Sequence, residues 1–406
     1  MIKLSKFPFK TMKSKPKVSD NISTSLMLQA WLIRQNLAWV YTYTTLWLRV
    51  LRKISNIVRE EMDKAWAYEM LMSSLSSREN WEATWRWDSV DVFFHVPAAN
   101  NKEYGLNFTH EEIVTPLMKE FINSYKDLPV CVYQIQTKFR NEKRAKSWLL
   151  RWREFLMKDA YSFHLDPKEF DEYYENMKKV YMTIFDRLWI WKDTYITLAD
   201  GGSFTDKYSH EFQTLLDIWE DEIYICKKCW TSHNKEIVPE SGFKCVNCGS
   251  TEYEVKKAAE VWNIFPLETK FTDAFDMTVL DKDGKQKKVI MWCYGIWVSR
   301  IMWVIAEKFA TENGINWPEN IAPADVYIIV IWEENIQKWE ELAKKFEQEW
   351  KEVILDDRMW KNISFWVKAK DCELLWIKTK VVISPKTLEK WWYEITKDGK
   401  TTIIKF

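Results

Sequence analysis

The segment from Thr137 to His164 decides the fold, and it reads TKFRNEKRAKSWLLRWREFLMKDAYSFH. Its two ends, with the residues before them, alternate in polarity and are rich in β-branched and aromatic side chains. This pattern predicts one strand over 129–142 and an antiparallel partner over 152–164, joined by a loop at 143–150. A helix is predicted to follow at about 167–187.

The charged and aromatic residues of this hairpin suit a nucleotide. The pattern is R-x-E, a loop, and then R-x-x-x-F-x-x-x-D, formed by Arg140, Glu142, Arg151, Phe155 and Asp159. Arg140 and Glu142 are two residues apart on one strand and therefore share a face. An arginine fork can bind phosphate, a carboxylate can accept from the adenine amino group, and a ring can stack on the base. The hairpin therefore predicts an ATP site without a phosphate loop, although a solvated hairpin with ion pairs would contain the same residues.

A second segment, MWCYGIWVSR at 291–300, predicts a strand, a tight turn and the start of a helix within 288–309. Arg300 begins that helix, where backbone amides and a guanidinium can hold a terminal phosphate together. Taken alone, Arg300 is as easily a surface arginine.

Two counts in the composition are abnormal, because the 406 residues include 26 tryptophans and only 9 glycines. Average usage predicts roughly 28 glycines. Trp81, Trp87 and Trp317 stand in contexts natural for tryptophan, whereas the other 23 stand where glycine would be natural. Trp66, for example, follows the amphipathic helix predicted over Leu48–Ala65, at the position where glycine usually ends a helix.

We therefore hypothesise that UGA codons were translated as tryptophan where the source reads them as glycine. Exchanging the 23 residues gives 32 glycines and 3 tryptophans, an ordinary composition. The alternative is a genuinely tryptophan-rich protein, such as a carbohydrate binder or a membrane-interface protein. The hypothesis predicts UGA codons at the 23 positions and UGG at the other three, and it predicts that indoles at Trp152 and Trp297 would push into the ATP site.

The remaining composition is that of a globular protein, with 59 basic and 59 acidic residues and 47% apolar residues. No apolar run is long enough for a membrane-spanning helix, and the N-terminus lacks the apolar region of a signal peptide. We expect a cytoplasmic protein. The basic segment 1–20 predicts a disordered solubilising tail or, alternatively, a weak nucleic-acid contact.

Four of the seven cysteines follow the spacing C-x₂-C-x₁₅-C-x₂-C and predict a structural Zn²⁺ site: Cys226, Cys229, Cys245 and Cys248. Further along, short apolar strands at 325–331, 352–357 and 379–385, with a helix at 335–350, predict a small α/β domain with a largely parallel sheet.

Together, the two nucleotide-site segments resemble motifs 2 and 3 of the class II aminoacyl-tRNA synthetases, and the prolyl-tRNA synthetase family most closely. "THEE" at 109–112 resembles that family's proline-binding loop, and "YSHEFQ" at 208–213 resembles another segment of its substrate pocket. "LRVLRKISNIVREEMDKA" resembles the motif 1 helix. The resemblance covers about residues 25 to 395. Glu268, in "FPLETKF", departs from it, because the family has glycine there.

The resemblance implies an α/β (α+β) fold with an antiparallel class II catalytic sheet, a zinc-ribbon insertion and a C-terminal anticodon-binding domain. The expected boundaries are a basic tail at 1–20, catalytic parts at 21–220 and 259–320, the ribbon at 221–258 and the anticodon domain at 321–406. The ribbon would either brace the catalytic domain or touch tRNA. The interval between motifs 2 and 3 is too short for the large editing domain that many bacterial relatives carry.

The resemblance also implies roles for individual residues. Arg140 and Arg300 would be catalytic. Arg140, Glu142, Arg151, Phe155, Gln213 and Arg300 would bind ATP. Thr109, Glu111, Arg140, His210 and Cys293 would bind proline. Glu211 could serve Mg²⁺ or the nucleotide.

The implied function is ATP-dependent activation of L-proline and its transfer to the 3′ end of tRNA(Pro) by a homodimer that uses ATP, Mg²⁺ and structural Zn²⁺. One alternative is a catalytically weak paralogue that binds tRNA or acts in regulation. Another is a different class II synthetase, such as the threonyl or glycyl enzyme.

Overall fold

A computed structural model describes residues 1–16, 21–38, 40–142, 152–218, 221–332, 336–360, 363–390, 392–397 and 399–405. The chain divides into two compact units. Unit 1 comprises Met1–Leu37, Tyr41–Lys53 and Ile305–Phe406, and unit 2 comprises Ala38–Val40 and Ile54–Val304. No helix among the described residues is both long and apolar enough to cross a membrane.

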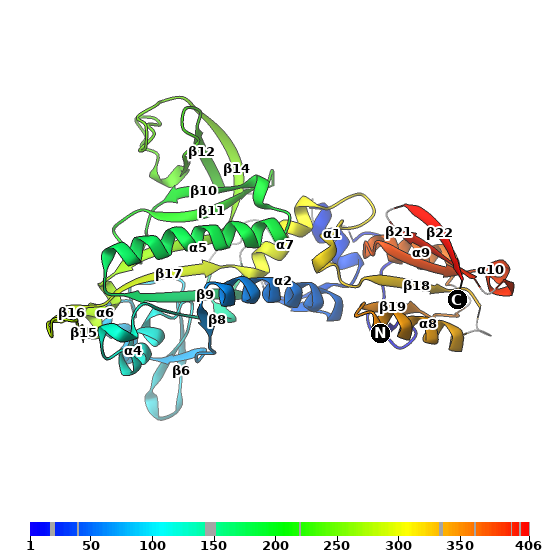
Figure 1. Ribbon diagram of the computed structural model, residues 1–406, viewed down its shortest axis with the longest axis horizontal. Helices are drawn as coiled ribbons and strands as arrows, with labels where there is room; N and C mark the ends of the chain where they lie inside the picture. The colour runs from blue at the N-terminus through cyan, green and yellow to red at the C-terminus, as the bar shows by residue number, and fades with distance from the viewer. Residues whose placement is uncertain are drawn as a thin grey trace. The chain divides into compact units, whose positions relative to one another are not determined.

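Unit 2 is built on one large sheet (Figure 1). Among the described residues its strand order is β11-β10-β13-β12-β14-β17-β9-β8-β4. The bounds are β4 Ala67–Glu69, β8 Val130–Phe139, β9 Glu154–His164, β10 Thr194–Ala199, β11 Ser209–Leu215, β12 Asp221–Cys226, β13 Ser232–Asn234, β14 Tyr253–Glu268 and β17 Ile290–Ile296. The pairs β8–β9, β9–β17 and β17–β14 are all antiparallel. The predicted hairpin is therefore confirmed.

The first strand of the hairpin is shorter than the sequence predicts. β8 ends at Phe139, so Arg140 and Glu142 follow the strand and do not share one of its faces. The Arg140 amide still donates to the Arg153 carbonyl at 2.9 Å, which keeps the two segments of the hairpin paired for one more residue.

Helix α5, Pro167–Arg187, covers one face of this sheet and matches the predicted helix (Figure 1). Proline at its first position needs no amide partner, and the Asp166 side chain accepts from the Lys168 amide at 2.7 Å, which fixes where the helix begins. Its buried face is largely aromatic and packs toward β9 and β17. Smaller elements complete the unit: α3 Arg78–Ala83, α4 Glu111–Phe121, α6 Lys270–Ala274, the sheet of β5 Leu75–Ser77, β7 Glu103–Leu106 and β6 Phe94–Pro97, and the hairpin of β15 Thr278–Leu280 and β16 Gln286–Lys288.

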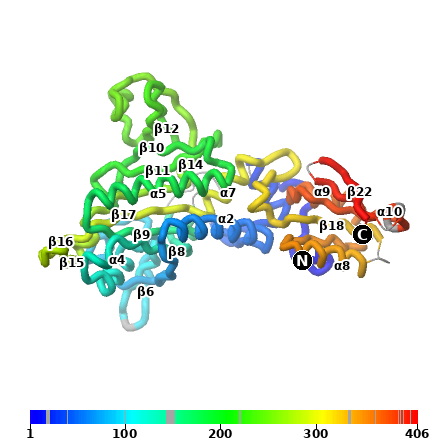
Figure 2. Tube along the Cα trace, viewed as in Figure 1, coloured from blue at the N-terminus to red at the C-terminus, as the bar shows by residue number. Residues whose placement is uncertain are grey.

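The cysteine-rich insertion is continuous with the large sheet, as the trace in Figure 2 shows. Strand β14 is 16 residues long. At its start Tyr253 pairs with Cys226 of the insertion, and further along Trp262 pairs with Ile296 of β17. One strand therefore links the cysteines to the centre of unit 2.

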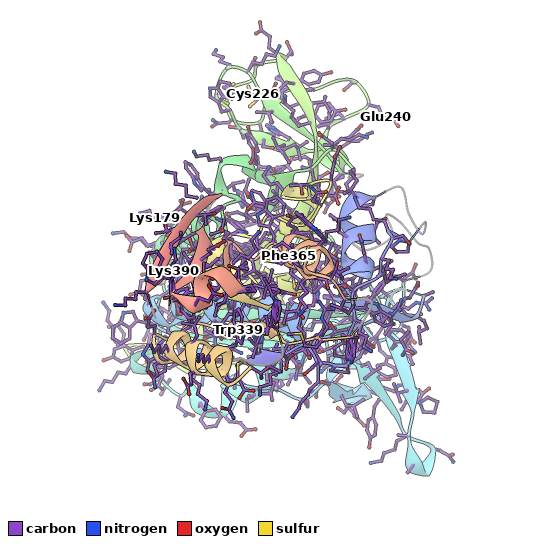
Figure 3. All side chains as sticks on the ribbon, turned by 90° about the vertical axis from the view of Figure 1, so that its right-hand side faces the viewer. Lys179, Cys226, Glu240, Trp339, Phe365 and Lys390 are labelled. Carbon is purple, nitrogen blue, oxygen red and sulfur yellow. The ribbon has the colours of Figure 1, made fainter. Side chains whose placement is uncertain are left out.

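Unit 1 contains a second sheet, whose described strands follow the order β1-β19-β18-β20-β21-β22. The bounds are β1 Ile2–Lys3, β18 Val326–Val330, β19 Val353–Asp356, β20 Thr379–Ile383, β21 Trp392–Lys397 and β22 Lys400–Lys405. The predicted strands and helix α8, Ile336–Gln348, are confirmed, and β19, β18 and β20 are parallel. The antiparallel hairpin β21–β22 was not predicted. Trp339 of α8, labelled in Figure 3, belongs to the apolar core with Val326 and Leu355.

The other helices and strands at or near unit 1 are α1 Ile22–Gln29, β2 Ile33–Leu37, β3 Val40–Tyr43, α2 Thr45–Lys64, α7 Val298–Lys308, α9 Phe365–Leu374 and α10 Pro385–Glu389. The predicted amphipathic helix corresponds to α2, and the strand, turn and helix at 288–309 correspond to β17 and α7.

The prediction of a disordered N-terminal tail is wrong for residues 1–16. Strand β1 adds to the sheet of unit 1 in parallel with β19, with Ile2 opposite Ile354. The physical reason is the alternation of apolar residues with lysine, because Ile2 and Leu4 are buried while Lys3 is paired with Glu340. Because the segment is rich in lysine, its sequence did not indicate this short strand.

Ten non-glycine residues in the described part of the chain have positive φ, and seven of these are tryptophans. The seven are Trp31, Trp66, Trp85, Trp189, Trp230, Trp350 and Trp376, with φ between 52° and 63°. Such angles are rare for bulky side chains and favour glycine. Six of the seven come two residues after the last residue of a helix, namely α1, α2, α3, α5, α8 and α9.

Candidate active site

The central strands of unit 2 surround a cavity of about 150 Å³ that brings together residues distant in sequence. Thr109 precedes α4, Arg140 follows β8, and Cys293 and Gly295 lie on β17. The cavity is lined by Phe108, Thr109, Arg140, Met157, Asp159, Phe204, Glu260, Trp262, Asn263, Phe265, Cys293, Gly295 and Trp297. Residues predicted for ATP and for proline therefore meet at one site.

A stack of flat groups forms one side of this site. The Phe155 ring on β9 lies 4.1 Å from the Trp297 ring, measured between centroids, at an interplanar angle of 32°. On the Trp297 ring the Arg300 guanidinium carbon lies 3.4 Å from the centroid. The indole thus fills a slot between an aromatic ring and a guanidinium, and this arrangement also suits a nucleobase.

Both predicted catalytic arginines lie beside this stack. The Arg140 guanidinium carbon is 5.1 Å from the Phe155 ring and 5.5 Å from the Trp297 ring. Arg300 is buried and donates to Glu260 through both the carbonyl, at 2.6 Å, and the carboxylate, at 3.2 Å. Glu260 fixes the guanidinium, a role that the sequence analysis did not assign.

The other indole expected in the ATP site does not enter it. Trp152 is buried and packs at the edge of Trp303, with 5.4 Å between ring centroids. It is not among the residues that line the cavity.

The predicted proline-binding residues form a buried acidic corner. Thr109 donates its hydroxyl to Glu111, which is fully buried and lies 3.7 Å from the Arg86 guanidinium. The adjacent Glu112 accepts from Arg86 at 2.8 Å, and burial raises its pKa to about 7. Burial and the Glu111 carboxylate raise the pKa of the Cys293 thiol, so this thiol is neutral.

Behind the cavity lies a polar network that the sequence analysis missed. Asp159 forms an ion pair with Lys138 at 2.7 Å and accepts from Tyr161 at 2.9 Å. Lys138 lies 2.6 Å from Nδ1 of His110. Burial and the neighbouring ammonium lower the pKa of His110 to about 3, so the imidazole is neutral and its Nδ1 accepts a hydrogen bond from the Lys138 ammonium. The network places Asp159, whose charge is paired with Lys138, at the cavity wall. The alternation of its residues along β8 and β9 is the sequence signal that could have indicated the face on which they lie.

A second carboxylate, Glu211, lies on β11 within a cluster of side-chain amides. It accepts from Gln213 at 2.7 Å, from Asn234 at 2.8 Å and from Asn263 at 3.3 Å. Burial and the nearby Glu260 raise its pKa well above the usual value. The amide oxygens of Gln213 and Asn263 are buried and accept no hydrogen bond from the described residues. Such oxygens, together with a carboxylate, form a ligand set that suits Mg²⁺.

Of the predicted site residues, Thr109, Arg140 and Cys293 line the cavity itself. His210 and Glu142 stand apart from it, and Arg151 lies outside the described residues. His210, also on β11, does not line the cavity, and its ring lies 5.3 Å from that of Tyr174. Burial lowers its pKa to about 4. Glu142 is half-buried, and its carbonyl accepts from Arg153 at 3.1 Å. Arg151 lies outside the described residues.

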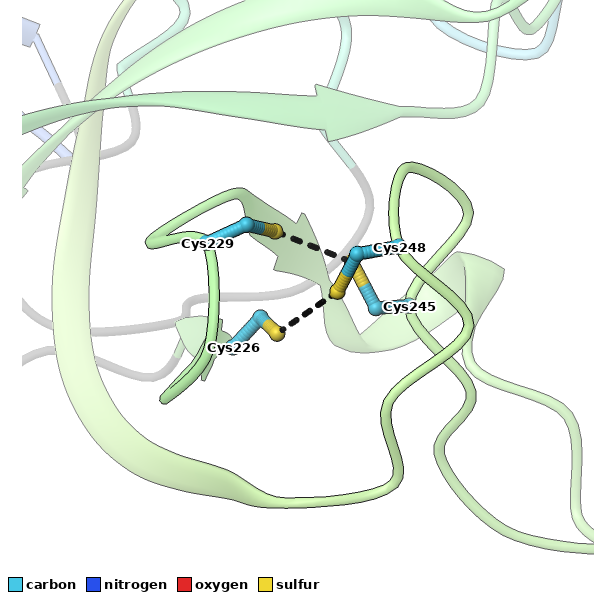
Figure 4. A group of neighbouring side chains, drawn as sticks. All are labelled: Cys226, Cys229, Cys245 and Cys248. Atoms are coloured by element: carbon cyan, nitrogen blue, oxygen red, sulfur yellow. Dashed lines mark hydrogen bonds between the residues drawn. The ribbon is translucent and has the colours of Figure 1, made fainter.

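The four spaced cysteines converge, as Figure 4 shows. All four sulfur atoms lie within 4.8 Å of one another, with 3.6 Å between Cys226 and Cys248 and 3.5 Å between Cys229 and Cys245. A tetrahedron with Zn–S bonds of ~2.3 Å has sulfur atoms ~3.8 Å apart. Hydrogen bonding from Thr231 lowers the pKa of the Cys229 thiol to about 6, which favours the thiolate that a metal needs. The geometry therefore fits a structural zinc site.

Residues 94–309 match the family described as tRNA synthetase class II core domain (G, H, P, S and T). A proline-tRNA ligase of Anaplasma marginale is 37% identical to this chain over 316 positions, which cover 74% of each protein. The proline-tRNA ligases of Bacillus cytotoxicus and Syntrophomonas wolfei are each 28% identical, covering 93% and 98% of this chain and 93% and 95% of their own lengths. The alignment with the Bacillus protein spans 532 positions, over a hundred more than the 406 residues here.

Proposed function

The chain belongs to the proline-tRNA ligases, a family of class II aminoacyl-tRNA synthetases, and on this basis we propose which of its residues activate proline. The observation that carries the proposal is the slot between Phe155 and Arg300, which adjoins Arg140 and the Thr109 corner in one cavity. A base in the slot and an amino acid in the corner would meet at Arg140.

The reaction needs charge and position and no protein nucleophile. Arg140 would contact both the proline carboxylate and the α-phosphate, and Arg300 and Arg151 the outer phosphates. Glu142 would accept from the adenine amino group. A carboxylate oxygen attacks the α-phosphorus, the bond to pyrophosphate breaks, and prolyl-adenylate forms. The 3′-terminal hydroxyl of the tRNA then attacks the prolyl carbonyl, and AMP leaves.

The proline imino group would bind in the acidic corner. Thr109 and Glu111 offer a hydroxyl and a buried carboxylate there, and the neutral Cys293 thiol supplies an apolar wall. His210 would complete the pocket wall from β11. Glu211 and Gln213 would hold Mg²⁺, which when bound would neutralise phosphate charge.

The four cysteines would hold Zn²⁺ as a brace and not as a catalytic metal. The support is the continuity of β14 and the hydrogen bond from Asn234, in the insertion, to Glu211. A contact between the ribbon and tRNA is the alternative. The other expectations are an anticodon-binding role for residues 321–406, recognition of tRNA(Pro), a homodimer, and a cytoplasmic location.

We further propose that the working enzyme has glycine at the 23 unusual tryptophan positions. The helix ends support this. After α8, the Trp350 amide donates to the Glu347 carbonyl at 2.9 Å, and the Lys351 amide donates to the Phe346 carbonyl at 3.0 Å. This pair of bonds is the Schellman motif, whose left-handed residue is usually glycine. The same pair of bonds recurs at Trp31, Trp85, Trp189 and Trp376. At Trp66 the first bond of the pair is present, from its amide to the Asp63 carbonyl at 3.0 Å.

The two cysteine knuckles offer an internal comparison. In the second, Gly249 follows Cys248 at φ 71°, and its amide donates to the Cys245 carbonyl at 2.9 Å. In the first, Trp230 follows Cys229 at φ 62°, and its amide donates to the Cys226 carbonyl at 2.9 Å. One turn thus occurs twice, once with glycine and once with tryptophan. Glycine at 297 would likewise empty the slot beside Phe155.

Two measurements test these proposals. The coding DNA should contain UGA at the 23 positions and UGG at Trp81, Trp87 and Trp317, and a mixture of codons would refute the recoding. The chain made with glycine at the 23 positions (the glycine form) should catalyse proline-dependent ATP–pyrophosphate exchange. Binding of tRNA without any exchange would instead favour a catalytically weak paralogue.

A further inference from the structure

A cavity of about 650 Å³ lies within unit 1, between the N-terminal segment Lys10–Lys15 and helix α9. This volume is within the range of ~300–1,000 Å³ typical of small-ligand sites. No residue that lines this cavity has been given an individual role above, although those of α9 lie in the region 321–406, for which an anticodon-binding role is expected.

Hydrogen bonds hold the N-terminal segment in place along this cavity. Ser5 donates its amide, at 2.8 Å, and its hydroxyl, at 2.7 Å, to Asp357. Thr11 donates to Asp371 of α9 at 2.6 Å. The Met12 amide donates to the Gln29 carbonyl at 2.8 Å, and the Gln29 side chain donates back to the Met12 carbonyl at 3.2 Å. The segment is therefore a built wall of the cavity.

The wall carries positive charge that the protein leaves uncompensated. Lys10, Lys13, Lys15 and Lys370 line the cavity, and none forms an ion pair with a carboxylate in the described part of the chain. The Lys15 ammonium donates to the Glu312 backbone carbonyl, which carries no net charge. The Asp371 carboxylate is already engaged by Arg358, at 2.7 Å. Glu312 and Glu373 also line the cavity, so five basic side chains face three acidic ones. The excess favours an anion.

The cavity also offers a buried acceptor. The Gln29 side-chain oxygen is buried and accepts no hydrogen bond from the described residues. A buried acceptor without a donor is unfavourable, so a ligand that donates to it would be bound more tightly. The Watson–Crick edge of an unpaired base supplies such a donor.

We infer that this cavity binds an unpaired nucleotide of the tRNA, with Lys13 and Lys15 on its phosphates and Gln29 on its base. This inference rests on the proposed function, and it assigns part of the RNA contact to the N-terminal segment. Trp360 also lines the cavity, with the Lys10 ammonium 4.7 Å from its ring. Glycine there would widen the cavity and release Lys10 for the RNA.

The test compares two variants of the glycine form. Lys13→Glu with Lys15→Glu reverses charge inside the cavity, whereas Lys6→Glu reverses an exposed charge that lies just before this segment and outside the cavity. The double variant should raise the KM for tRNA about tenfold or more. It should also reduce the slope of log KM against log salt by about 1.4, because each single-strand phosphate contact contributes ~0.7. The Lys6 variant should change neither value.

Two further readouts separate this inference from the proposed function. Proline-dependent pyrophosphate exchange needs no tRNA and should stay unchanged in the double variant. Charging of a minihelix that contains only the acceptor stem should also stay unchanged. An equal KM in the double and Lys6 variants, an equal loss with the minihelix, or a loss of exchange in the double variant alone would overturn the inference. Absence of exchange in the unsubstituted glycine form would count against the proposed function instead.

Discussion

Replacing Trp66, Trp85 and Trp189 together by glycine should stabilise unit 2. Their φ values are 58°, 60° and 63°, and their side chains are 80%, 87% and 48% exposed. A left-handed conformation costs a residue with a side chain ~1–2 kcal/mol. Replacement by glycine relieves this strain, but ~0.4–1 kcal/mol of the stabilisation is lost again because glycine increases the conformational entropy of the unfolded chain. Since the three residues end different helices, the gains should add to about 2–3 kcal/mol.

The assay is equilibrium unfolding in urea, followed by far-ultraviolet circular dichroism because indole fluorescence would change with the number of tryptophans. The matched control is the triple alanine variant, which removes the same indoles but retains a Cβ at each left-handed position. It should gain much less than the glycine variant. Trp81→Gly should lose stability, since Trp81 is fully buried and its indole donates to Ser76 at 2.5 Å. An equal gain in the alanine and glycine variants would refute the backbone argument.

Three other predictions concern the site, the metal and pH. Trp297→Gly should strengthen ATP binding at least tenfold in calorimetry, because the indole fills the slot beside Phe155, and unchanged binding would show that the slot is not used. Removing metal from the glycine form with a chelator should lower proline-dependent exchange. Asn234→Ala should produce part of that loss with the metal still bound, because Asn234 donates to Glu211 at 2.8 Å. Full activity after verified metal loss would exclude the role of the metal site as a brace. Burial lowers the pKa of His164 from 6.5 to about 4, so the folded state favours neutral imidazole and its contribution to stability is present above pH 6.5 and lost as pH falls toward 4. His164→Gln should weaken this acid dependence in urea unfolding, and an unchanged pH profile would contradict the assignment.

The elements that the sequence predicted are those whose signals are local. Helix α5 has an aspartate cap, a proline at its first position and an apolar stripe, and both of its ends were predicted correctly. The hairpin of β8 and β9 has two alternating runs, and the cysteine spacing alone indicated the cluster in Figure 4. Trp66 was expected at a left-handed position because of its place after a helix, and its φ of 58° agrees. Glu268, where the related family has glycine, likewise has a φ of 51°.

What the sequence did not predict depends on contacts between distant residues. Asn234 approaches Glu211 only because β14 joins the insertion to the large sheet. Lys138 would be called a surface residue from its type, yet it is fully buried against Asp159. Alternation along β8 and β9 could indicate which side chains share a face of the sheet, but it does not indicate which residue is the partner, because a buried charge is tolerated only where the fold supplies its counter-charge.

The position of β1 has a consequence for the order in which the protein folds. Ile2 pairs with Ile354, so β1 has no partner until the residues around Ile354 have been made. At ~5–20 residues per second, this delay is about 18–70 s. During that interval the apolar Ile2 and Leu4 stay exposed, and the lysines among them keep the waiting segment soluble. Strand β1 is therefore synthesised long before the strand with which it pairs, and its folding waits for that partner.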